Sequence, residues 1–117
     1  QTTVESLLEA NEISQEFNLI ASGGIRNAFD IFKSLCFGAK MVGISATILN
    51  YLLTNGCQAT IELIEQWKNE LKTLYTMSGA LKTSDLTSVP LILSGNPQNW
   101  CQARNIDIKK YSMRKPV

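Results

Sequence analysis

The sequence predicts an α/β fold built on parallel β-strands, and three observations support that prediction. Two short apolar runs, Phe17 to Ala21 and Met41 to Ser45, lack the polar alternation of a half-exposed strand, which is typical of parallel strands buried on both faces. An amphipathic helical segment follows each run after a brief loop. Strand, helix, strand and helix is the order of a βαβ unit, in which the carboxyl ends of both strands meet at one edge of the sheet.

A glycine-rich turn, Ser22 to Arg26, follows the first apolar run. Glycine allows the backbone to approach a ligand closely, and the free amides at the start of the next helix attract an anion. Arg26 adds a planar cation that suits phosphate. Taken alone, such a turn is more often a plain connection with a surface arginine. Ser45 and Ala46, however, follow the second run and reach the same edge, and two converging turns favour a phosphate-binding site.

Three helices are expected around these strands. The first covers Val4 to Asn11, with Thr3 as its N-cap. The second begins at Asn27 and carries a 3.6-residue apolar pattern up to Gly38, a glycine at the usual position after a helix end. The third covers Ala46 to Leu53.

The second half of the chain is expected to be mainly helical. After Asn55-Gly56, a long helix over Cys57 to Met77 carries an apolar stripe, which is more typical of a core or a subunit contact than of a cofactor site. Val89 to Leu93 is expected to be extended. A last helix over Trp100 to Asn105 is expected to start at Asn96 or Asn99. The basic tail, Lys109 to Lys115, has no periodicity and is expected to be frayed.

Composition argues against several classes of protein. The formal net charge is +1 and no basic stripe is present, which argues against nucleic-acid binding, and no apolar run is long enough to span a membrane. Three widely spaced cysteines without any histidine argue against a zinc site and favour reduced thiols in a cytoplasmic protein. Because histidine is absent, the usual general base is missing, and any chemistry needs a cofactor or residues outside this chain.

Several stretches of the chain resemble a known class of enzyme. Leu19 to Arg26, followed by Asp30, Lys33 and the run Phe37 to Ile44, resembles the last two βα units of FMN-dependent (β/α)8 barrels. Further segments make the resemblance more particular, and they are Gln1 to Leu7, Ala21-Ser22, Glu70 to Ala80, and Trp100 to Arg104. Together these segments are similar to the C-terminal third of type 2 isopentenyl-diphosphate isomerases, up to about Asp107.

The resemblance implies a more specific α/β fold, namely the C-terminal portion of a (β/α)8 TIM barrel, with about the last two βα units and additional C-terminal helices. Residues 1–56 would form the last βα units of an FMN-binding barrel, and residues 57–117 a C-terminal helical extension packing on that barrel. Because a complete barrel needs roughly 200 residues or more, the chain is expected to be part of a longer polypeptide.

The resemblance also implies a cofactor site. The FMN phosphate would lie between the two turns, bound by backbone amides and one guanidinium group. The implied cofactor-binding residues are Gly23, Gly24, Ile25, Arg26, Ser45 and Ala46. No catalytic residue and no metal ligand is expected within this chain.

The activity implied by the resemblance is the interconversion of isopentenyl and dimethylallyl diphosphate in isoprenoid biosynthesis. Reduced FMN would take part in the proton transfers, Mg2+ would neutralise the substrate diphosphate, and NADPH would serve as the reductant of the flavin. The cofactor would carry the difficult chemistry while the protein orients it. The enzyme is expected to be a cytoplasmic homo-oligomer that acts on a small isoprenoid diphosphate.

Two alternatives remain open. One is an FMN-dependent oxidoreductase of the same barrel class, similar to the 2-hydroxy-acid oxidases. That branch typically has Asp where this chain has Ser22, and Gly-Arg-Pro where it has Ser45-Ala46-Thr47, so these residues argue against it. The other is a non-catalytic phosphate-binding or assembly fragment.

Overall fold

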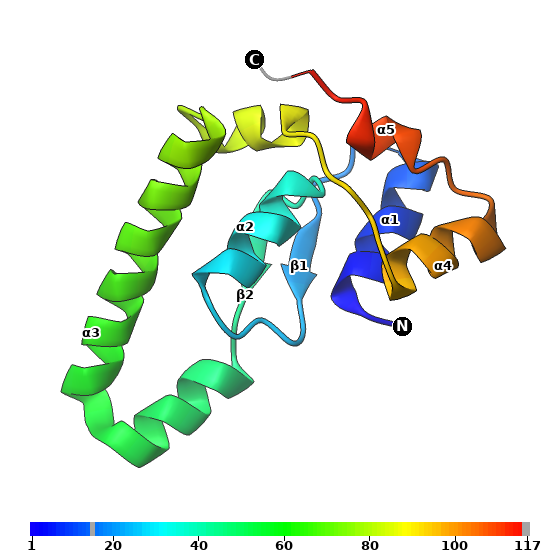
Figure 1. Cartoon of the computed structure of the whole chain (residues 1–117). Helices are drawn as coiled ribbons and strands as arrows, with labels where there is room; N and C mark the ends of the chain where they lie inside the picture. The colour runs from blue at the N-terminus through cyan, green and yellow to red at the C-terminus, as the bar shows by residue number, and fades with distance from the viewer. Residues whose placement is uncertain (15, 116–117) are drawn as a thin grey trace.

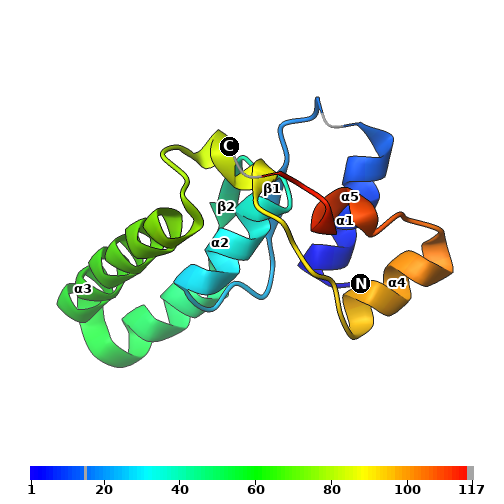
Figure 2. The same ribbon diagram turned by 45° about the horizontal axis from the view of Figure 1, so that its top comes forward.

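The computed structural model describes residues 1–14 and 16–115. Its elements, in chain order, are α1 (Thr3–Ile13), β1 (Ile20–Ser22), α2 (Ala28–Cys36), β2 (Met41–Gly43), α3 (Ala46–Ser78), the 3-10 helix η1 (Thr83–Ser88), α4 (Asn96–Arg104) and α5 (Lys109–Ser112). The two strands and α2 occupy the middle of the molecule, as Figures 1 and 2 show from two directions. Helices α1, α4 and α5 gather on one side of them, and α3 extends along the other.

The two strands pair in parallel, which confirms the βαβ order predicted from the sequence. Ile20 pairs with Met41, Ala21 with Val42 and Ser22 with Gly43. The expectation that the sheet is buried on both faces is wrong for this chain. Successive strand side chains point to opposite faces, and only the face that carries Ala21 is covered, whereas Ile20 and Met41 are 65% and 63% exposed.

Helix α1 begins one residue earlier than the sequence predicts, because its N-cap is Thr2 and not Thr3. The Thr2 hydroxyl accepts a hydrogen bond from the Glu5 amide at 3.2 Å. The Glu5 carboxylate in turn accepts one from the Thr2 amide at 2.8 Å, which completes a capping box. This arrangement leaves the Thr3 hydroxyl free for a long-range contact.

Helix α2 has the predicted apolar face, and Asn27, the predicted first residue, is its N-cap. The Asn27 side chain accepts a hydrogen bond from the Asp30 amide at 2.9 Å. Phe32, Leu35 and Cys36 are buried. They form a core cluster together with Ala80 and Leu86 from the far half of the chain.

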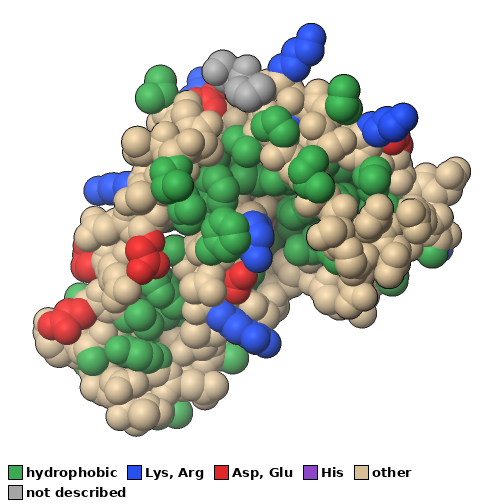
Figure 3. All heavy atoms as spheres, viewed as in Figure 1, with side chains coloured by type: hydrophobic (Ala, Val, Ile, Leu, Met, Phe, Trp, Pro, Cys, Tyr) green, Lys and Arg blue, Asp and Glu red, His purple; other side chains and the backbone are tan. Residues whose placement is uncertain are grey.

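Helix α3 consists of two segments that meet at Gly56. The backbone of Gly56 (φ 87, ψ 174) is not helical, so the predicted stop at Asn55-Gly56 is a kink. Beyond it, Trp67 is buried and Leu71 and Leu74 pack against the α2 cluster, as the predicted stripe requires. The part of that stripe nearer to the Gly56 kink, which contains Ile61 and Ile64, is exposed. Figure 3 shows green hydrophobic side chains both over the middle of the molecule and on the α3 lobe.

The C-terminal tail is packed, so the expectation of a frayed terminus is wrong. Residues 109–112 form α5, and Tyr111 is buried. One guanidinium nitrogen of Arg114 donates to the Cys36 carbonyl at 2.7 Å and to the Val89 carbonyl at 3.3 Å. The segment of residues 89–93 forms no strand, but the Leu91 amide donates to the Tyr111 carbonyl at 2.9 Å. Contacts across the sequence, not local periodicity, therefore order this tail.

Helix α4 is anchored on α1. It begins at Asn96, one of the two starts that the sequence offers. The Trp100 indole nitrogen donates to a Glu9 carboxylate oxygen at 3.1 Å, and the Arg104 guanidinium donates to the same oxygen at 2.7 Å. The Arg104 hydrogen bond is the main reason why the pKa of Glu9 lies below its ordinary value.

Candidate functional site

The carboxyl ends of β1 and β2 lie side by side, as the parallel order predicts. Ser22, the last residue of β1, pairs with Gly43, the last residue of β2. The turn of residues 22–26 and the start of α3 therefore begin from neighbouring points on one edge of the sheet. We call this edge, with residues 22–26 and 43–47, the carboxyl edge.

The glycine pair adopts a backbone conformation that other residues rarely reach. Gly23 has φ 103 and Gly24 has φ 70. A Cβ on Gly23 would lie 3.3 Å from the Thr3 hydroxyl oxygen, whereas a Cβ on Gly24 would meet nothing within 4 Å. Both glycines are exposed, so their backbone is open to a ligand.

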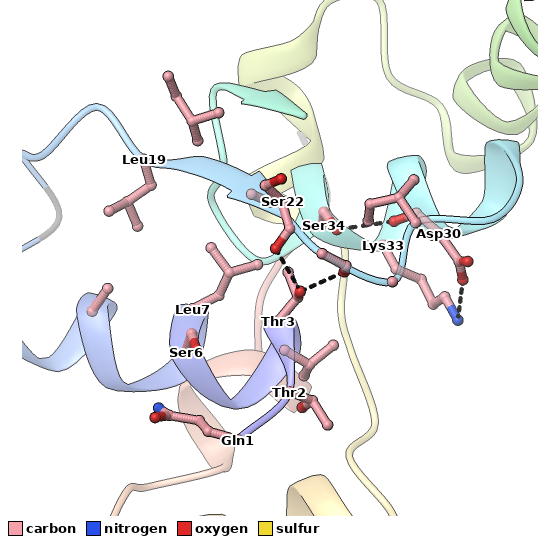
Figure 4. A pocket seen from close by; sticks show the side chains of 17 residues that line it. Gln1, Thr2, Thr3, Ser6, Leu7, Leu19, Ser22, Asp30, Lys33 and Ser34 are labelled. Atoms are coloured by element: carbon pink, nitrogen blue, oxygen red, sulfur yellow. Dashed lines mark hydrogen bonds and ion pairs between the residues drawn. The ribbon is translucent and has the colours of Figure 1, made fainter. Parts of the chain in front are cut away.

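Two threonine hydroxyls hold the turn in place, and sequence reasoning assigned this role to neither of them. Thr3 donates to the carbonyls of Ser22 at 2.9 Å and Gly23 at 2.7 Å, as Figure 4 shows. Thr47 donates to the carbonyl of Ile25 at 2.7 Å. The first contact ties the turn to α1, and the second ties it to the start of α3. The two threonines therefore occupy three carbonyls of the turn, those of Ser22, Gly23 and Ile25.

The helix N-termini at this edge differ in how their first amides are satisfied. At α2, the Asn27 side chain caps the Asp30 amide, and the Asp30 carboxylate accepts from the Arg26 amide at 3.0 Å. At α3, Ser45 is the N-cap residue but forms no side-chain cap hydrogen bond. The first amides of α3, which like those of any helix have no intrahelical partner, therefore also lack a side-chain cap. The positive end of the helix dipole lies beside the glycine turn, to which Thr47 is bonded.

The structure brings the six implied cofactor-binding residues to one edge, in two segments. All are exposed except Ile25, whose buried side chain fixes the turn against the core. Within residues 1–14 and 16–115, the guanidinium of Arg26 makes no hydrogen bond and no ion pair, so it remains available to an anion. Lys33 instead pairs with Asp30, with 3.4 Å between the ammonium nitrogen and a carboxylate oxygen.

A hollow of about 670 Å³ lies next to the glycine turn, on the side of α1. Figure 4 shows Thr3, Ser22, Asp30 and Lys33 around it. The lining includes residues 22–25 but not Arg26, Ser45 or Ala46. The hollow therefore adjoins the space between the two turns without coinciding with it.

Two further features of the described part of the chain bear on function. Among residues 1–14 and 16–115, no group of three or more Asp, Glu, Cys or His side chains is arranged to hold a metal ion. Over the same residues, no helix is both long enough and apolar enough to cross a membrane.

Comparison with known proteins assigns this chain to a family. Residues 1–92 match the family of FMN-dependent dehydrogenases. Since this match covers most of the chain, the chain belongs to the FMN-dependent dehydrogenase family.

Individual proteins that are similar to this chain share a more specific name. The chain is 39% identical over 108 residues to an isopentenyl-diphosphate delta-isomerase from Latilactobacillus sakei, which covers 92% of this chain and 31% of that protein. Proteins of the same name from Listeria monocytogenes and Staphylococcus aureus are 43% identical over 96 residues and 37% identical over 110 residues. These cover 82% and 94% of this chain, and 27% and 32% of the relatives. The chain thus spans about a third of the length of the curated relatives that it matches.

Proposed function

We propose that this chain forms the last two βα units of a (β/α)8 barrel and binds the phosphate of FMN at the carboxyl edge. The observation that carries the proposal is the pairing of Ser22 with Gly43, which sets a positive-φ glycine turn beside an uncapped helix start. Residues 1–56 supply this edge, and residues 57–117 act as a helical extension that packs on the barrel.

The donor set at this edge suits a phosphate group. The proposed contacts are the amides of Gly23, Gly24, Ile25, Ser45 and Ala46 and the guanidinium of Arg26. A phosphate dianion gains from backbone amides at a helix N-terminus and from a planar guanidinium, and the missing Cβ atoms leave room for its oxygens. When bound, FMN supplies the flavin chemistry, and this chain's part is to bind and orient the cofactor.

For the whole protein we propose the isomerisation of isopentenyl diphosphate to dimethylallyl diphosphate, with Mg2+ and with NADPH as the flavin reductant. The similarity to three proteins named isopentenyl-diphosphate delta-isomerase supports this activity. The chain spans about a third of their length, so the substrate and metal contacts are proposed to lie in parts of the protein outside this chain. We further propose a homo-oligomer located in the cytoplasm.

A second candidate is an FMN-dependent oxidoreductase acting on 2-hydroxy acids. The family match to FMN-dependent dehydrogenases favours it. The residues at the carboxyl edge argue against it, because Ser22 and Ser45-Ala46-Thr47 stand where the 2-hydroxy-acid oxidases typically have Asp and Gly-Arg-Pro.

One experiment separates the two candidates. The whole protein is incubated anaerobically with FMN, NADPH, Mg2+ and isopentenyl diphosphate, and the products are followed by proton NMR. The isomerase proposal expects dimethylallyl diphosphate to accumulate without matching consumption of NADPH. Absence of turnover, together with bleaching of the bound flavin by a 2-hydroxy acid, would contradict it and favour the oxidoreductase.

A further inference from the structure

A second hollow, of about 320 Å³, lies at the opposite end of the sheet. Leu19 and Lys40, which directly precede β1 and β2, line it, and the Lys40 amide donates to the Leu19 carbonyl at 2.8 Å. The end of α1 and the C-terminal tail complete its wall. We call this space the basic hollow, and its charged lining residues are Glu12, Lys40, Lys110 and Arg114.

The basic hollow carries an excess of positive charge. Three of its lining residues are cations and one is a carboxylate. The carboxylate of Glu12 pairs with the Lys110 ammonium at 2.7 Å, and this hydrogen bond is the main reason why the pKa of Lys110 is raised. Lys40 and Arg114 then remain without a compensating carboxylate among the residues that the structure describes. Two neighbouring cations of this kind favour an anion between them.

Arg114 is the more constrained of these two cations. Its guanidinium lies 4.9 Å from the centre of the Tyr111 ring. Hydrogen bonds to the Cys36 and Val89 carbonyls use only one of its nitrogens, whereas a guanidinium has five N–H donors in a rigid fork. Burial lowers the pKa of Arg114, because removing a cation from water disfavours the charged form. An anion bound in the hollow would offset that cost.

Neutral donors complete the lining. The Asn11 amide nitrogen donates to the Phe37 carbonyl at 2.6 Å and lies 3.4 Å from the Tyr111 hydroxyl oxygen. The Tyr111 hydroxyl accepts that bond and keeps its own proton for donation. The hollow thus offers a fork, an ammonium group and a phenol, which is the donor chemistry that binds phosphate.

We propose that the basic hollow binds a small multivalent anion of the phosphate class, such as a phosphate or diphosphate group. The site lies at the amino end of the strands, opposite the edge proposed for the flavin phosphate, and it uses none of the same residues. The proposal therefore stands independently of the proposed function.

The test measures binding of inorganic pyrophosphate and inorganic phosphate to the purified protein by isothermal titration calorimetry, with chloride holding the ionic strength constant. Lys40→Gln is the first variant, because the Lys40 side chain makes no hydrogen bond or ion pair within the described residues and its loss leaves the packing intact. We expect the pyrophosphate affinity to fall about fivefold or more. Arg114→Lys, which keeps the charge but loses the fork, is expected to lower it as well.

Two control variants give the result its meaning. Lys72→Gln removes an exposed lysine on α3, outside the hollow, and tests for a general effect of charge. Arg104→Gln removes an arginine that pairs with Glu9 and lines neither the basic hollow nor the carboxyl edge, and both controls are expected to keep the parent affinity. An unchanged affinity in Lys40→Gln, an equal loss in the two control variants, or no measurable binding at millimolar pyrophosphate would overturn the proposal.

Discussion

The two ends of the small sheet are built in different ways. At the carboxyl edge, the proposed contacts are mostly backbone amides that come from two short segments, and uncharged threonine hydroxyls hold these segments in place. At the amino end, the basic hollow is lined by side chains from segments as distant in sequence as Asn11 and Tyr111. The first site should therefore be sensitive to any change in backbone conformation, and the second to loss of charge.

The largest effect is expected for Gly23→Val at the carboxyl edge. A β-branched residue at φ 103 is strained by roughly 1–3 kcal/mol, and its Cβ would lie 3.3 Å from the Thr3 oxygen. We expect FMN affinity, measured by quenching of flavin fluorescence in the whole protein, to fall at least about tenfold. Gly79→Val is the matched control, because Gly79 also has positive φ but lies at the end of α3. Equal FMN affinities of the two variants would contradict a role for the turn.

Arg26→Ala is expected to have the next largest effect. If the guanidinium makes a charged contact with the FMN phosphate, its loss weakens binding by about 1–3 kcal/mol. The control is Arg104→Ala, which removes an arginine on α4 that pairs with Glu9 on α1. Unchanged flavin affinity in Arg26→Ala would remove this residue from the site.

Thr47→Val tests whether the two turns act together. The substitution removes the hydrogen bond to the Ile25 carbonyl at nearly constant volume, and we expect about 1 kcal/mol weaker FMN binding. Thr73→Val is its counterpart, because Thr73 donates to the Asn69 carbonyl within α3, far from the edge. FMN binding that responds equally to both variants would show that Thr47 has no specific role.

A prediction about stability instead of flavin binding concerns Cys36, whose carbonyl accepts from Arg114 beside the basic hollow. Burial raises the pKa of the Cys36 thiol from 9.0 to about 11. The unfolded thiol therefore ionises before the folded one, so stability is full below pH 9.0 and falls as the pH rises toward about 11. Urea unfolding at stepped pH should show this fall in the parent and a shallower one in Cys36→Ala. An identical fall of the unfolding free energy with pH in the parent and in Cys36→Ala would contradict this prediction.

Thiol labelling gives a second view of the same packing. Cys57 is exposed, whereas Cys36 and Cys101 are buried. At pH 8, a thiol reagent should label Cys57 quickly and the other two at least about tenfold more slowly, because their thiols must first be exposed by opening of the fold. Rapid labelling of all three would show that the core clusters do not protect Cys36 and Cys101.

The carboxyl edge could be predicted because its signals are local. The apolar runs, the glycine pair and the helical pattern that begins at Asn27 act within a few residues, and the structure confirms the parallel pairing. The capping of α1 was misplaced by one residue, since Thr2 and Thr3 are adjacent residues of the same type. Only the fold shows that Thr3 reaches Ser22, 19 positions away.

The basic hollow and the packed tail could not be predicted in the same way. A run such as Lys109 to Lys115 has no periodicity, and its order depends on contacts with distant carbonyls, such as that of Arg114 with Cys36. The exposed strand face has a similar origin. The apolar residues around Ile20 and Met41 are of types that suit a buried strand. In the described part of the chain, however, other elements pack on only one face of the sheet.

The central claim is that the carboxyl edge binds the flavin phosphate through its backbone. The most direct test is a titration of the whole 15N-labelled protein with FMN, followed by the amide chemical shifts. Binding as proposed predicts the largest changes at the amides of Gly23, Gly24, Ile25, Ser45 and Ala46, with Lys40 and Lys110 unchanged. Flavin binding that leaves the carboxyl-edge amides unmoved, or that shifts the basic hollow most, would contradict the account.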